Sequence, residues 1–291
     1  MDAGRAMRPP RIALATCGKL PEPDHDERPL SDALGALGAE VAISAWDDPS
    51  VDWARFDLCV IRSTWNYVHR LPEFLSWAKR TSRVTRLANP WELVRWNSDK
   101  RYLKDMEARG IRIVPTVFCP RGSARPLSGI LARSGWTDVV IKPQVGAASF
   151  MTRRFSGRLA AAENFLRRVG AERDMLIQPY VPSVETRGEH SLVYVSGRLT
   201  HAVRKSPRLA GGREGVSSSL PITRDERRFA LRALKPFRDG ILYARVDVAR
   251  AADGGLMLME LELIEPSLFL LQNPRALRLF ARSCVRLCPC K

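Results

Sequence analysis

An apolar run near the carboxyl end of the chain carries three glutamates, and this feature constrains the fold most strongly. The segment "LMELELIEPSLFLL" (258–271) places Glu260, Glu262 and Glu265 among Leu, Met, Ile, Phe, Pro and Ser. Apolar density of this kind predicts a buried strand, and a buried carboxylate without a partner is costly. The three glutamates therefore need a specific structural reason.

A hairpin accounts for part of this pattern. The segment "ARVDVARAADGGLMLMELELI" predicts two strands joined by a turn at 253–254. With that turn, Asp247 lies opposite Glu260 and Arg245 lies opposite Glu262, and all four side chains project from one face. Opposed like charges about 5 Å apart destabilise a sheet. Asp247 and Glu260 therefore need a shared proton or a cation between them.

Two interpretations of these carboxylates remain open on the hairpin alone. A divalent ion such as Mg²⁺ suits an all-oxygen cluster. Alternatively, Arg245 neutralises Glu262 in a structural ion pair while Asp247 or Glu260 is solvated, and a register slip of one residue would exchange the faces. Glu265 is an odd number of residues from Glu262, so we expect it on the other face or beyond the strand end, with a structural or loop-anchoring role. Contact with a substrate is the alternative for Glu265.

Length and composition exclude several classes of protein. A chain of 291 residues suggests about two domains. No stretch of 18 apolar residues occurs and the amino terminus has no apolar signal-peptide region, so we expect a cytoplasmic protein with no membrane partner. The net charge of +16 would suit an anionic partner, but the basic residues are scattered, and we expect no nucleic-acid partner. A homo-oligomer is compatible with the sequence.

The cysteines indicate neither a metal centre nor an oxidising compartment. Cys17, Cys59 and Cys119 stand apart in apolar surroundings, where a thiol behaves as a small buried hydrophobe. The tail "CVRLCPCK" lacks a nearby fourth ligand, so we expect no zinc site there and reduced thiols throughout.

Strands and helices alternate in the first third of the chain. "RIALATC" and "FDLCVIR" predict buried strands, and "LSDALGALGAE" and "PEFLSWAKR" predict helices. This alternation predicts a small α/β domain with a parallel sheet that extends to about Trp96. Ser98 is then expected to cap the helix "DKRYLKDMEARG", which carries Lys100 and ends at Gly110. Further strands are predicted at "IVPTVF", "DVVIKP" and "DMLIQPYV", and a hairpin in "EHSLVYVSGRLTHAVRK".

A lysine followed by small residues marks a candidate phosphate site. "VVIKPQVGAAS" carries Lys142 at the end of an apolar strand, followed by Gly146, Ala147, Ala148 and Ser149. Small residues let backbone N–H groups approach phosphate oxygens, and the lysine adds a point charge. The stretch is not a Walker A loop, and taken alone a surface lysine after a strand is the simpler interpretation.

The order of these features along the chain is more specific than each one alone. Lys100 precedes Lys142, and "QPYVPSVE" then places Gln178 seven residues before Glu185. The hairpin with Lys205 follows, and "ARVDV" with "MELE" comes last. This series resembles the ATP-grasp superfamily, which includes D-alanine–D-alanine ligase, glutathione synthetase and biotin carboxylase.

The resemblance implies an α/β fold of the α+β grasp type. A Rossmann-like pre-grasp domain would occupy residues 1–97, and an ATP-grasp domain residues 98–291. The second would consist of a central subdomain (98–180) with the phosphate loop and a carboxy-terminal subdomain (181–291) with the metal site, and ATP would lie between them.

The resemblance also implies a set of site residues. The implied ATP contacts are Lys100, Lys142, Gly146, Ser149, Gln178, Tyr180, Val181 and Glu185. The implied ligands of magnesium, with two ions expected and Mn²⁺ as a substitute, are Asp247, Glu260 and Glu262. Arg245 matches a family arginine that stabilises the transferring phosphoryl group, and Lys205 joins it as a candidate catalytic residue. Two positions depart from the family pattern, because Gln178 replaces a more usual acidic residue and Glu262 replaces Asn.

Longer segments are similar to one group within the superfamily. "DLCVIRSTWNY", "LANPWELVRWNSDKRYL", "GEHSLVYVSGRLTHAVRK" and "LELIEPSLFL" resemble the group of the cycloserine-forming O-ureido-serine cyclo-ligase. The resemblance implies substrate contacts by residues that follow a strand of the first domain: Arg62, Ser63, Trp65 and Tyr67. Packing at a domain interface is the alternative for Trp65 and Tyr67. The tail "RSCVRLCPCK" does not resemble the group, and we expect no role for it.

The function implied is an ATP- and Mg²⁺-dependent carboxylate–amine ligase that forms an amide through an acylphosphate on an amino-acid-like small molecule, including an intramolecular cyclisation. Two alternatives share the nucleotide site. One is a ligase that acts on a peptide or protein acceptor, and the other is a degenerate nucleotide-binding module without catalysis.

Overall fold

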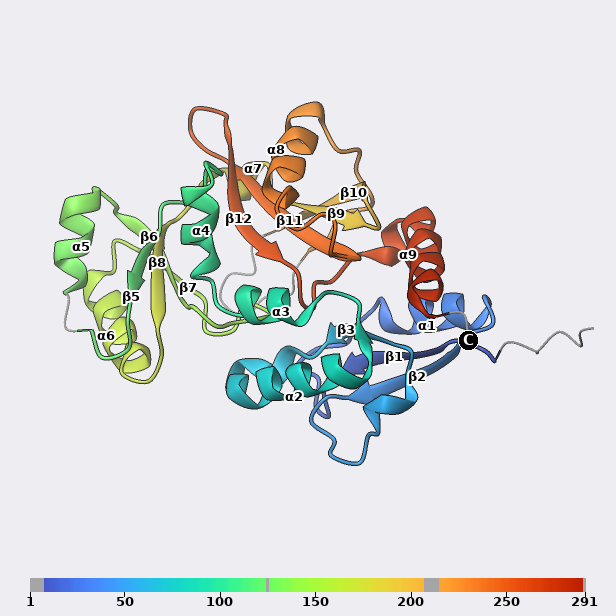
Figure 1. Cartoon of the computed structure of the whole chain (residues 1–291). Coiled ribbons are helices and arrows are strands. Elements are labelled where there is room, and N and C mark those ends of the chain that lie inside the picture. The colour runs from blue at the N-terminus through green and yellow to red at the C-terminus, as the bar shows by residue number, and fades with distance from the viewer. Residues whose placement is uncertain (1–7, 124–125, 207–214, 290–291) are drawn as a thin grey trace, which may run out of the picture.

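The computed structural model describes residues 8–123, 126–206 and 215–289, and it has the mixed α/β architecture that the sequence predicts. Three four-stranded sheets follow one another along the chain, and helices cover them (Figure 1). Each sheet falls inside one of the three ranges expected from the sequence. The domain boundaries themselves stay a prediction.

The first sheet is parallel, with the strand order β2-β1-β3-β4. Its central strands are buried because helices cover the faces of a parallel sheet, and such strands are therefore continuously apolar. Its elements are β1 (Arg11–Thr16), α1 (Glu27–Gly35), β2 (Glu40–Ala45), the 3-10 helix η1 (Trp53–Arg55), β3 (Leu58–Ser63), the 3-10 helix η2 (Trp65–His69), α2 (Leu71–Val84) and β4 (Arg86–Leu87).

The second sheet is antiparallel, with the order β5-β8-β6-β7, and two helices pack together beside it. Alternate residues of β6 and β8 enter a small core with these helices, so the other face of the sheet is left for the site. Its elements are β5 (Val117–Cys119), α5 (Leu127–Ser134), β6 (Asp138–Pro143), β7 (Arg153–Ser156), α6 (Leu159–Gly170) and β8 (Met175–Pro179).

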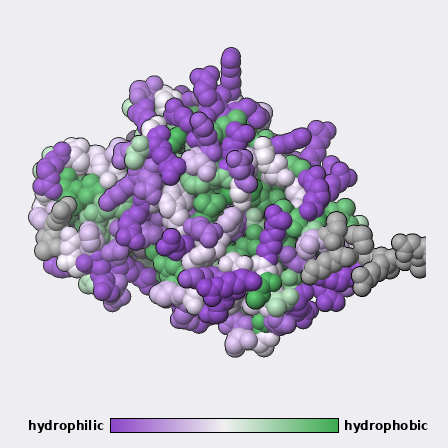
Figure 2. Space-filling model, viewed as in Figure 1, coloured by the Kyte–Doolittle hydropathy of each residue, from purple (hydrophilic) through white to green (hydrophobic). Residues whose placement is uncertain are grey.

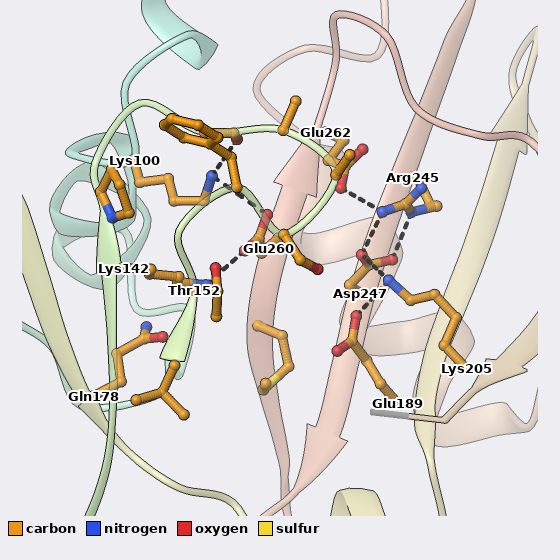
Figure 3. Close-up of a pocket in the computed structure, with 18 of the residues that line it drawn as sticks. Lys100, Lys142, Thr152, Gln178, Glu189, Lys205, Arg245, Asp247, Glu260 and Glu262 are labelled. Carbon is orange, nitrogen blue, oxygen red and sulfur yellow. Dashed lines mark hydrogen bonds and ion pairs between the residues drawn. The ribbon is translucent and has the colours of Figure 1, made fainter. Parts of the chain in front are cut away.

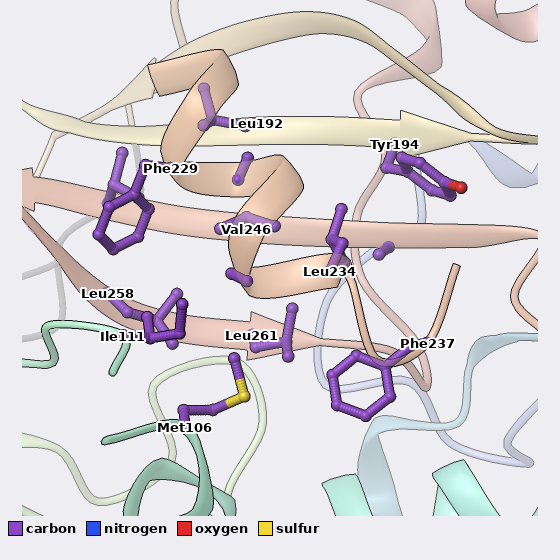
Figure 4. Close-up of a cluster of buried hydrophobic side chains, with 14 of the residues drawn as sticks. Met106, Ile111, Leu192, Tyr194, Phe229, Leu234, Phe237, Val246, Leu258 and Leu261 are labelled. Atoms are coloured by element: carbon purple, nitrogen blue, oxygen red, sulfur yellow. The ribbon is translucent and has the colours of Figure 1, made fainter. Parts of the chain in front are cut away.

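The third sheet is antiparallel, with the order β10-β9-β11-β12. One face packs on α8, where Phe229 and Leu234 meet Leu192, Val246 and Leu261 of the strands (Figure 4). The elements are α7 (Ser183–Thr186), β9 (Glu189–Val195), β10 (Arg198–Lys205), α8 (Arg224–Leu234), β11 (Tyr243–Arg250) and β12 (Leu256–Glu262).

The register of the β11–β12 hairpin agrees with the sequence prediction at the charged positions. Arg245 pairs with Glu262 and Asp247 pairs with Glu260. The connection is longer than a two-residue turn, because Arg250 pairs with Leu256. A bulge between Asp247 and Val248, opposite 258–260, restores the register.

The helix that precedes the second sheet differs from its prediction. Ser98 does not cap it, because Ser98 follows the last residue of α3 (Trp91–Asn97), and its hydroxyl donates to the Arg95 carbonyl. The next helix, α4 (Tyr102–Ala108), starts later. Lys100 therefore lies in the turn between two short helices and not on a helix.

The carboxy-terminal segment forms a helix that packs against the amino-terminal unit. Helix α9 (Pro274–Leu287) lies beside α1 (Figure 1), and the 3-10 helix η3 (Leu270–Gln272) precedes it. Phe280 is fully buried in a cluster that also contains Leu14 of β1 and Val193 of β9. The expectation that this tail has no role is therefore wrong for residues 282–288, which end α9 and contribute to this cluster. Cys290 lies outside the described residues.

Hydrophilic side chains predominate on the face shown in Figure 2, as the high charge predicts. No helix among the described residues is long and apolar enough to cross a membrane. The cysteines at 17, 59, 119, 284 and 288 are buried, as the sequence predicts for the first three.

Candidate active site

A pocket lies where the second and third sheets face each other, and segments of the amino-terminal unit close one side of it. It collects most of the residues predicted from the sequence: Trp65, Tyr67, Lys100, Lys142, Gly146, Ser149, Gln178, Tyr180, Val181, Lys205, Arg245, Asp247, Glu260 and Glu262.

Two lysines converge on Glu260 from the other side of the pocket (Figure 3). Lys142, at the end of β6, places its Nζ atom 2.6 Å from Glu260 Oε1. Lys100 places its Nζ atom 3.6 Å from Glu260 Oε2. Burial raises the pKa of the Glu260 carboxyl, but Lys100 and Lys142 outweigh it and lower the pKa to about 2. The carboxylate is therefore ionised at neutral pH.

A second charge cluster surrounds Asp247. Arg245 donates to Asp247 from Nε at 2.9 Å and from Nη2 at 2.8 Å, and it also contacts Glu262. Lys205 Nζ lies 2.9 Å from Asp247 and 2.7 Å from Glu189. Burial raises the pKa of Asp247, but Arg245 and Lys205 together lower it well below its usual value.

The pKa values of Glu262 and Glu189 are raised, whereas that of Asp247 is lowered. Burial raises the pKa of Glu262, and the neighbouring Asp247 and Glu260 raise it further, while Arg245 opposes them. Burial and Asp247 also raise the pKa of Glu189, against the effect of Lys205. Among the described residues, the neighbouring carboxylates therefore raise one another's pKa, and a further cation would relieve this repulsion.

The carboxylates suit magnesium in chemistry and placement. Asp247 and Glu260 face each other on neighbouring strands, with Glu262 two residues further along, and all supply oxygen ligands. Within the described ranges, however, no three His, Cys, Asp or Glu side chains are already grouped around one point. Each carboxylate contacts Lys or Arg instead, so binding a metal requires these cations to move to other partners.

The small-residue loop after β6 borders the pocket. Ala148 and Ser149 have φ values of 48° and 58°, in the left-handed region that is unusual for residues with a side chain. Lys100 Nζ donates to the Gly146 carbonyl at 2.7 Å. The loop is also in contact with the amino-terminal unit, because the rings of Phe150 and His69 lie edge to face 4.8 Å apart.

One part of the pocket is an apolar slot. The predicted nucleotide residues Gln178, Tyr180 and Val181 line it, together with the apolar side chains Val114, Val140, Val184 and Met259. Glu185 does not line the pocket. Its carboxylate accepts hydrogen bonds from Tyr180 (2.9 Å) and Arg154 (2.6 Å).

The structure divides the four predicted substrate residues into two pairs. Trp65 and Tyr67 line the pocket. Arg62 and Ser63 do not, which corrects the expectation that they face the substrate. Arg62 is fully buried, donates to the Pro266 carbonyl at 3.0 Å and pairs with Asp24 and Asp26. Ser63 is buried and donates to Thr16.

Several pocket residues had no strong sequence signal. Glu189 begins β9 directly before an apolar run, and the hairpin pattern could have suggested that it faces Lys205. Thr152 and Ser267 lie in loops, where no periodicity marks them. Glu265, expected beyond the strand, does lie past the end of β12 and lines the pocket.

Comparisons with known proteins place this geometry in a family. Residues 12–89 match the profile described as "D-cycloserine synthetase DcsG, N-terminal domain". The cycloserine biosynthesis protein DcsG of Streptomyces lavendulae is 35% identical over 274 residues, which are 88% of this chain and 92% of that protein. The crystal structure of D-cycloserine synthetase DcsG superposes with a TM-score of 0.87 and 34% identity, covering 95% of this chain and 99% of that one.

A more distant structure shares the fold alone. It is the ATP-grasp ligase PsnB in complex with a precursor variant, Mg and ADP, with a TM-score of 0.67 and 15% identity over 97% of this chain and all of that one (100%). The resemblance to ATP-grasp ligases and to the cycloserine-forming group is thus confirmed. This chain belongs to the family of D-cycloserine synthetase DcsG and is a carbon–nitrogen ligase with the ATP-grasp fold.

Proposed function

We propose that the protein is an ATP- and Mg²⁺-dependent ligase that activates a substrate carboxylate as an acylphosphate and joins it to an amine. The observation that carries this proposal is the meeting of Lys142 and Glu260 across the pocket, 2.6 Å apart. The second sheet supplies cations suited to phosphates, and the third supplies carboxylates suited to metal ions. Together they match a site for a nucleotide phosphate chain and its metal.

In this proposal Lys100 and Lys142 bind the phosphates, together with the backbone amides of the loop from Gly146 to Ser149. The adenine lies in the apolar slot beside Gln178, Tyr180 and Val181. Glu185 receives the ribose hydroxyls at the rim, after exchanging its bond with Tyr180 or Arg154.

Asp247, Glu260 and Glu262 are the residues that would hold Mg²⁺, two ions in our proposal, with Mn²⁺ as a substitute. The metal supplies neutralisation of phosphate charge. The lysines and carboxylates that now neutralise one another would exchange partners when nucleotide and metal enter, so the two ligands should bind cooperatively.

The chemical step is attack of the substrate carboxylate oxygen on the γ-phosphorus, with ADP as the leaving group. Arg245 and Lys205 neutralise charge on the transferring phosphoryl group. The amine nitrogen then attacks the acyl carbon, a C–N bond forms, and phosphate leaves with the electron pair of the broken C–O bond. Trp65 and Tyr67 border the space for the substrate.

Family membership supports a proposal for the substrate class. We propose an amino-acid-like small molecule in natural-product biosynthesis, and an intramolecular ring closure of the type that yields cycloserine. A cytoplasmic location, the absence of nucleic-acid and membrane partners, and assembly into a homo-oligomer belong to the same proposal.

The test is release of ADP by the purified protein with MgATP, screened over free amino acids and O-ureidoserine, with hydroxylamine present to trap an acylphosphate. We expect hydroxamate to form only when nucleotide, metal and one of the carboxylates are all present. Release of AMP, or ADP release that is independent of any carboxylate, would contradict the proposal.

A further inference from the structure

The side chain of Glu265 is a buried carboxylate in the pocket that Trp65 and Tyr67 also line. The residue is only 8% exposed, and it lines the same pocket as Lys100 and Arg245. In residues 8–123, 126–206 and 215–289 these two cations pair with other carboxylates, and no ion pair is formed with Glu265. A buried carboxylate without a cation is costly, so its position points to a ligand that carries a positive charge or a proton.

The backbone around Glu265 is fixed from several directions. Trp65 Nε1 donates to the Glu265 carbonyl at 3.1 Å, and Arg62 donates to the Pro266 carbonyl at 3.0 Å. Asp26 accepts hydrogen bonds from two backbone amides further along the loop, at 3.0 and 2.7 Å. The buried Arg62 and Asp26 therefore have a positioning role, and the carboxylate of Glu265 is held in place before any substrate binds.

The neighbours of Glu265 adjust its protonation. Burial raises the pKa of the carboxyl, the Tyr67 hydroxyl and Lys100 oppose this effect, and the resulting pKa is about 7. A group with this property can accept and release a proton near neutral pH, as a general base must.

We propose that Glu265 accepts a hydrogen bond from the uncharged nucleophilic N–H group of the substrate and takes its proton as the amide bond forms. This inference rests on the acylphosphate route proposed above. The N–H group supplies a hydrogen-bond donor to the buried carboxylate. As the nitrogen attacks the acyl carbon with its lone pair, the C–N bond forms and phosphate leaves with the electrons of the C–O bond. The single proton lost by the nitrogen moves to a carboxylate oxygen of Glu265 and then to water.

The proposal also restricts the substrate. The acyl group is activated near Arg245 and Lys100, and Glu265 lies close enough to both cations for them to lower the pKa of its carboxyl. An amino-acid-like molecule that carries both a carboxylate and a nucleophilic N–H group fits this arrangement. The rival role for Glu265 is structural, as a protonated carboxyl that hydrogen-bonds to Tyr67.

Two products from one mixture separate these roles. O-ureido-D-serine and MgATP are incubated with and without hydroxylamine, and both the hydroxamate and the cyclised amide are measured. Hydroxylamine is largely uncharged at neutral pH and needs no base to become nucleophilic, so it reports formation of the acylphosphate alone. With O-ureido-D-serine at saturating concentration, we expect Glu265→Gln to lower the ratio of amide to hydroxamate ~100-fold.

The matched control is Asp26→Asn, which disturbs the same loop from outside the pocket. A substitution that only displaces the loop should lower the rates of amide and hydroxamate formation by the same factor. We expect this result for Asp26→Asn. If Glu265→Gln does not fold, Tyr67→Phe provides a second test. Loss of the hydroxyl that lowers the pKa of Glu265 should move the rising limb of the amide rate to higher pH. The ratio of amide to hydroxamate at each pH reports this shift separately from any change in substrate binding.

The outcomes separate the inference from the function on which it rests. Parallel loss of both products in Glu265→Gln, or no loss of the amide, would overturn the role of Glu265 alone. An unchanged pH dependence of the amide rate in Tyr67→Phe would likewise overturn the role of Glu265. Absence of hydroxamate from the wild-type protein would overturn the acylphosphate route and the inference with it.

Discussion

Asp247 and Glu260 lie directly opposite each other on β11 and β12, yet each carboxylate contacts a different set of cations. Asp247 is bound by Arg245 and Lys205 of the same sheet, and Glu260 by Lys142 from the facing sheet. The cations that such opposed carboxylates require are thus side chains of the protein itself. The salt bridge between Lys142 and Glu260 therefore joins the second sheet to the third across the pocket.

Removal of one lysine should weaken nucleotide binding. A charge-assisted contact with phosphate contributes about 1.5–3 kcal/mol, so Lys142→Ala should raise the Kd of MgATP at least tenfold. Calorimetric titration measures this change. Lys79→Ala, at an exposed position on α2, is the control and should bind as the wild type does; equal affinities in all three proteins would remove Lys142 from the site.

Glu260→Gln should affect both stability and catalysis. The pKa of Glu260 is lowered to about 2 from 4.5, so its contribution to stability is present above about pH 4.5 and is lost as the pH falls through about 2. The variant should be less stable at neutral pH by roughly 1–3 kcal/mol, because two lysines lose their partner, and this difference should shrink in acid. Magnesium-dependent turnover should fall by orders of magnitude.

Denaturant unfolding and ADP release on the same samples test both effects, and the exposed Glu107→Gln serves as the control. If Glu260→Gln is as stable as the control at neutral pH, the salt bridge between the sheets contributes nothing to the fold.

Glu265 should make stability depend on pH in the opposite sense. Its pKa is raised from 4.5 to about 7, so the folded state binds the proton more tightly than the unfolded state does. The stabilisation is complete below about pH 4.5 and is lost as the pH rises through about 7, with a total of roughly 3 kcal/mol. Melting curves across this window should show a smaller decline for Glu265→Gln than for the wild type; identical slopes would contradict the raised pKa.

The loop from Gly146 to Thr152 should close more tightly around bound nucleotide. Ala148 and Ser149 have positive φ values. The ring of Phe150 contacts the ring of His69 and the guanidinium group of Arg173. Phe150→Ala should speed proteolytic cleavage of the loop, and a non-hydrolysable ATP analogue with Mg²⁺ should slow cleavage in the wild type. Cleavage that is insensitive to both changes would mean that the loop does not respond to nucleotide.

Helix α9 should be required for stability. Phe280 is fully buried and its ring lies 5.6 Å from that of Tyr243. Phe280→Ala should lower the free energy of unfolding by about 3–5 kcal/mol, measured by urea denaturation, whereas Arg282→Ala on the exposed side of the helix should have little effect. A small change at Phe280 would indicate that the helix packs only loosely.

The sequence predicts the parts of the site that depend on local periodicity. The facing of Asp247 and Glu260 follows from alternation along two strands, although the prediction assumed a short turn, and the real loop and the bulge compensate for each other. Lys142 follows from its place at the end of an apolar strand. These features need no knowledge of distant contacts.

Contacts between distant segments could not be predicted in the same way. Arg62 seemed available to a substrate, but Asp24, Asp26 and the Pro266 carbonyl bury it. Serine commonly caps the amino end of a helix, but the segment before Ser98 forms its own helix, α3. Ser98 therefore stands at the carboxyl end of α3. The pairing of Lys142 with Glu260 joins two sheets far apart in the chain, and no local pattern reveals it.

Activation of a carboxylate as an acylphosphate can be followed through the fate of a carboxylate oxygen. O-ureido-D-serine labelled with oxygen-18 in its carboxylate is converted with unlabelled MgATP, and the phosphate released is examined by mass spectrometry. We expect ADP as the nucleotide product and one labelled oxygen in the inorganic phosphate, because the C–O bond to the transferred phosphoryl group breaks when the nitrogen attacks. Unlabelled phosphate, or label in AMP, would contradict the acylphosphate route.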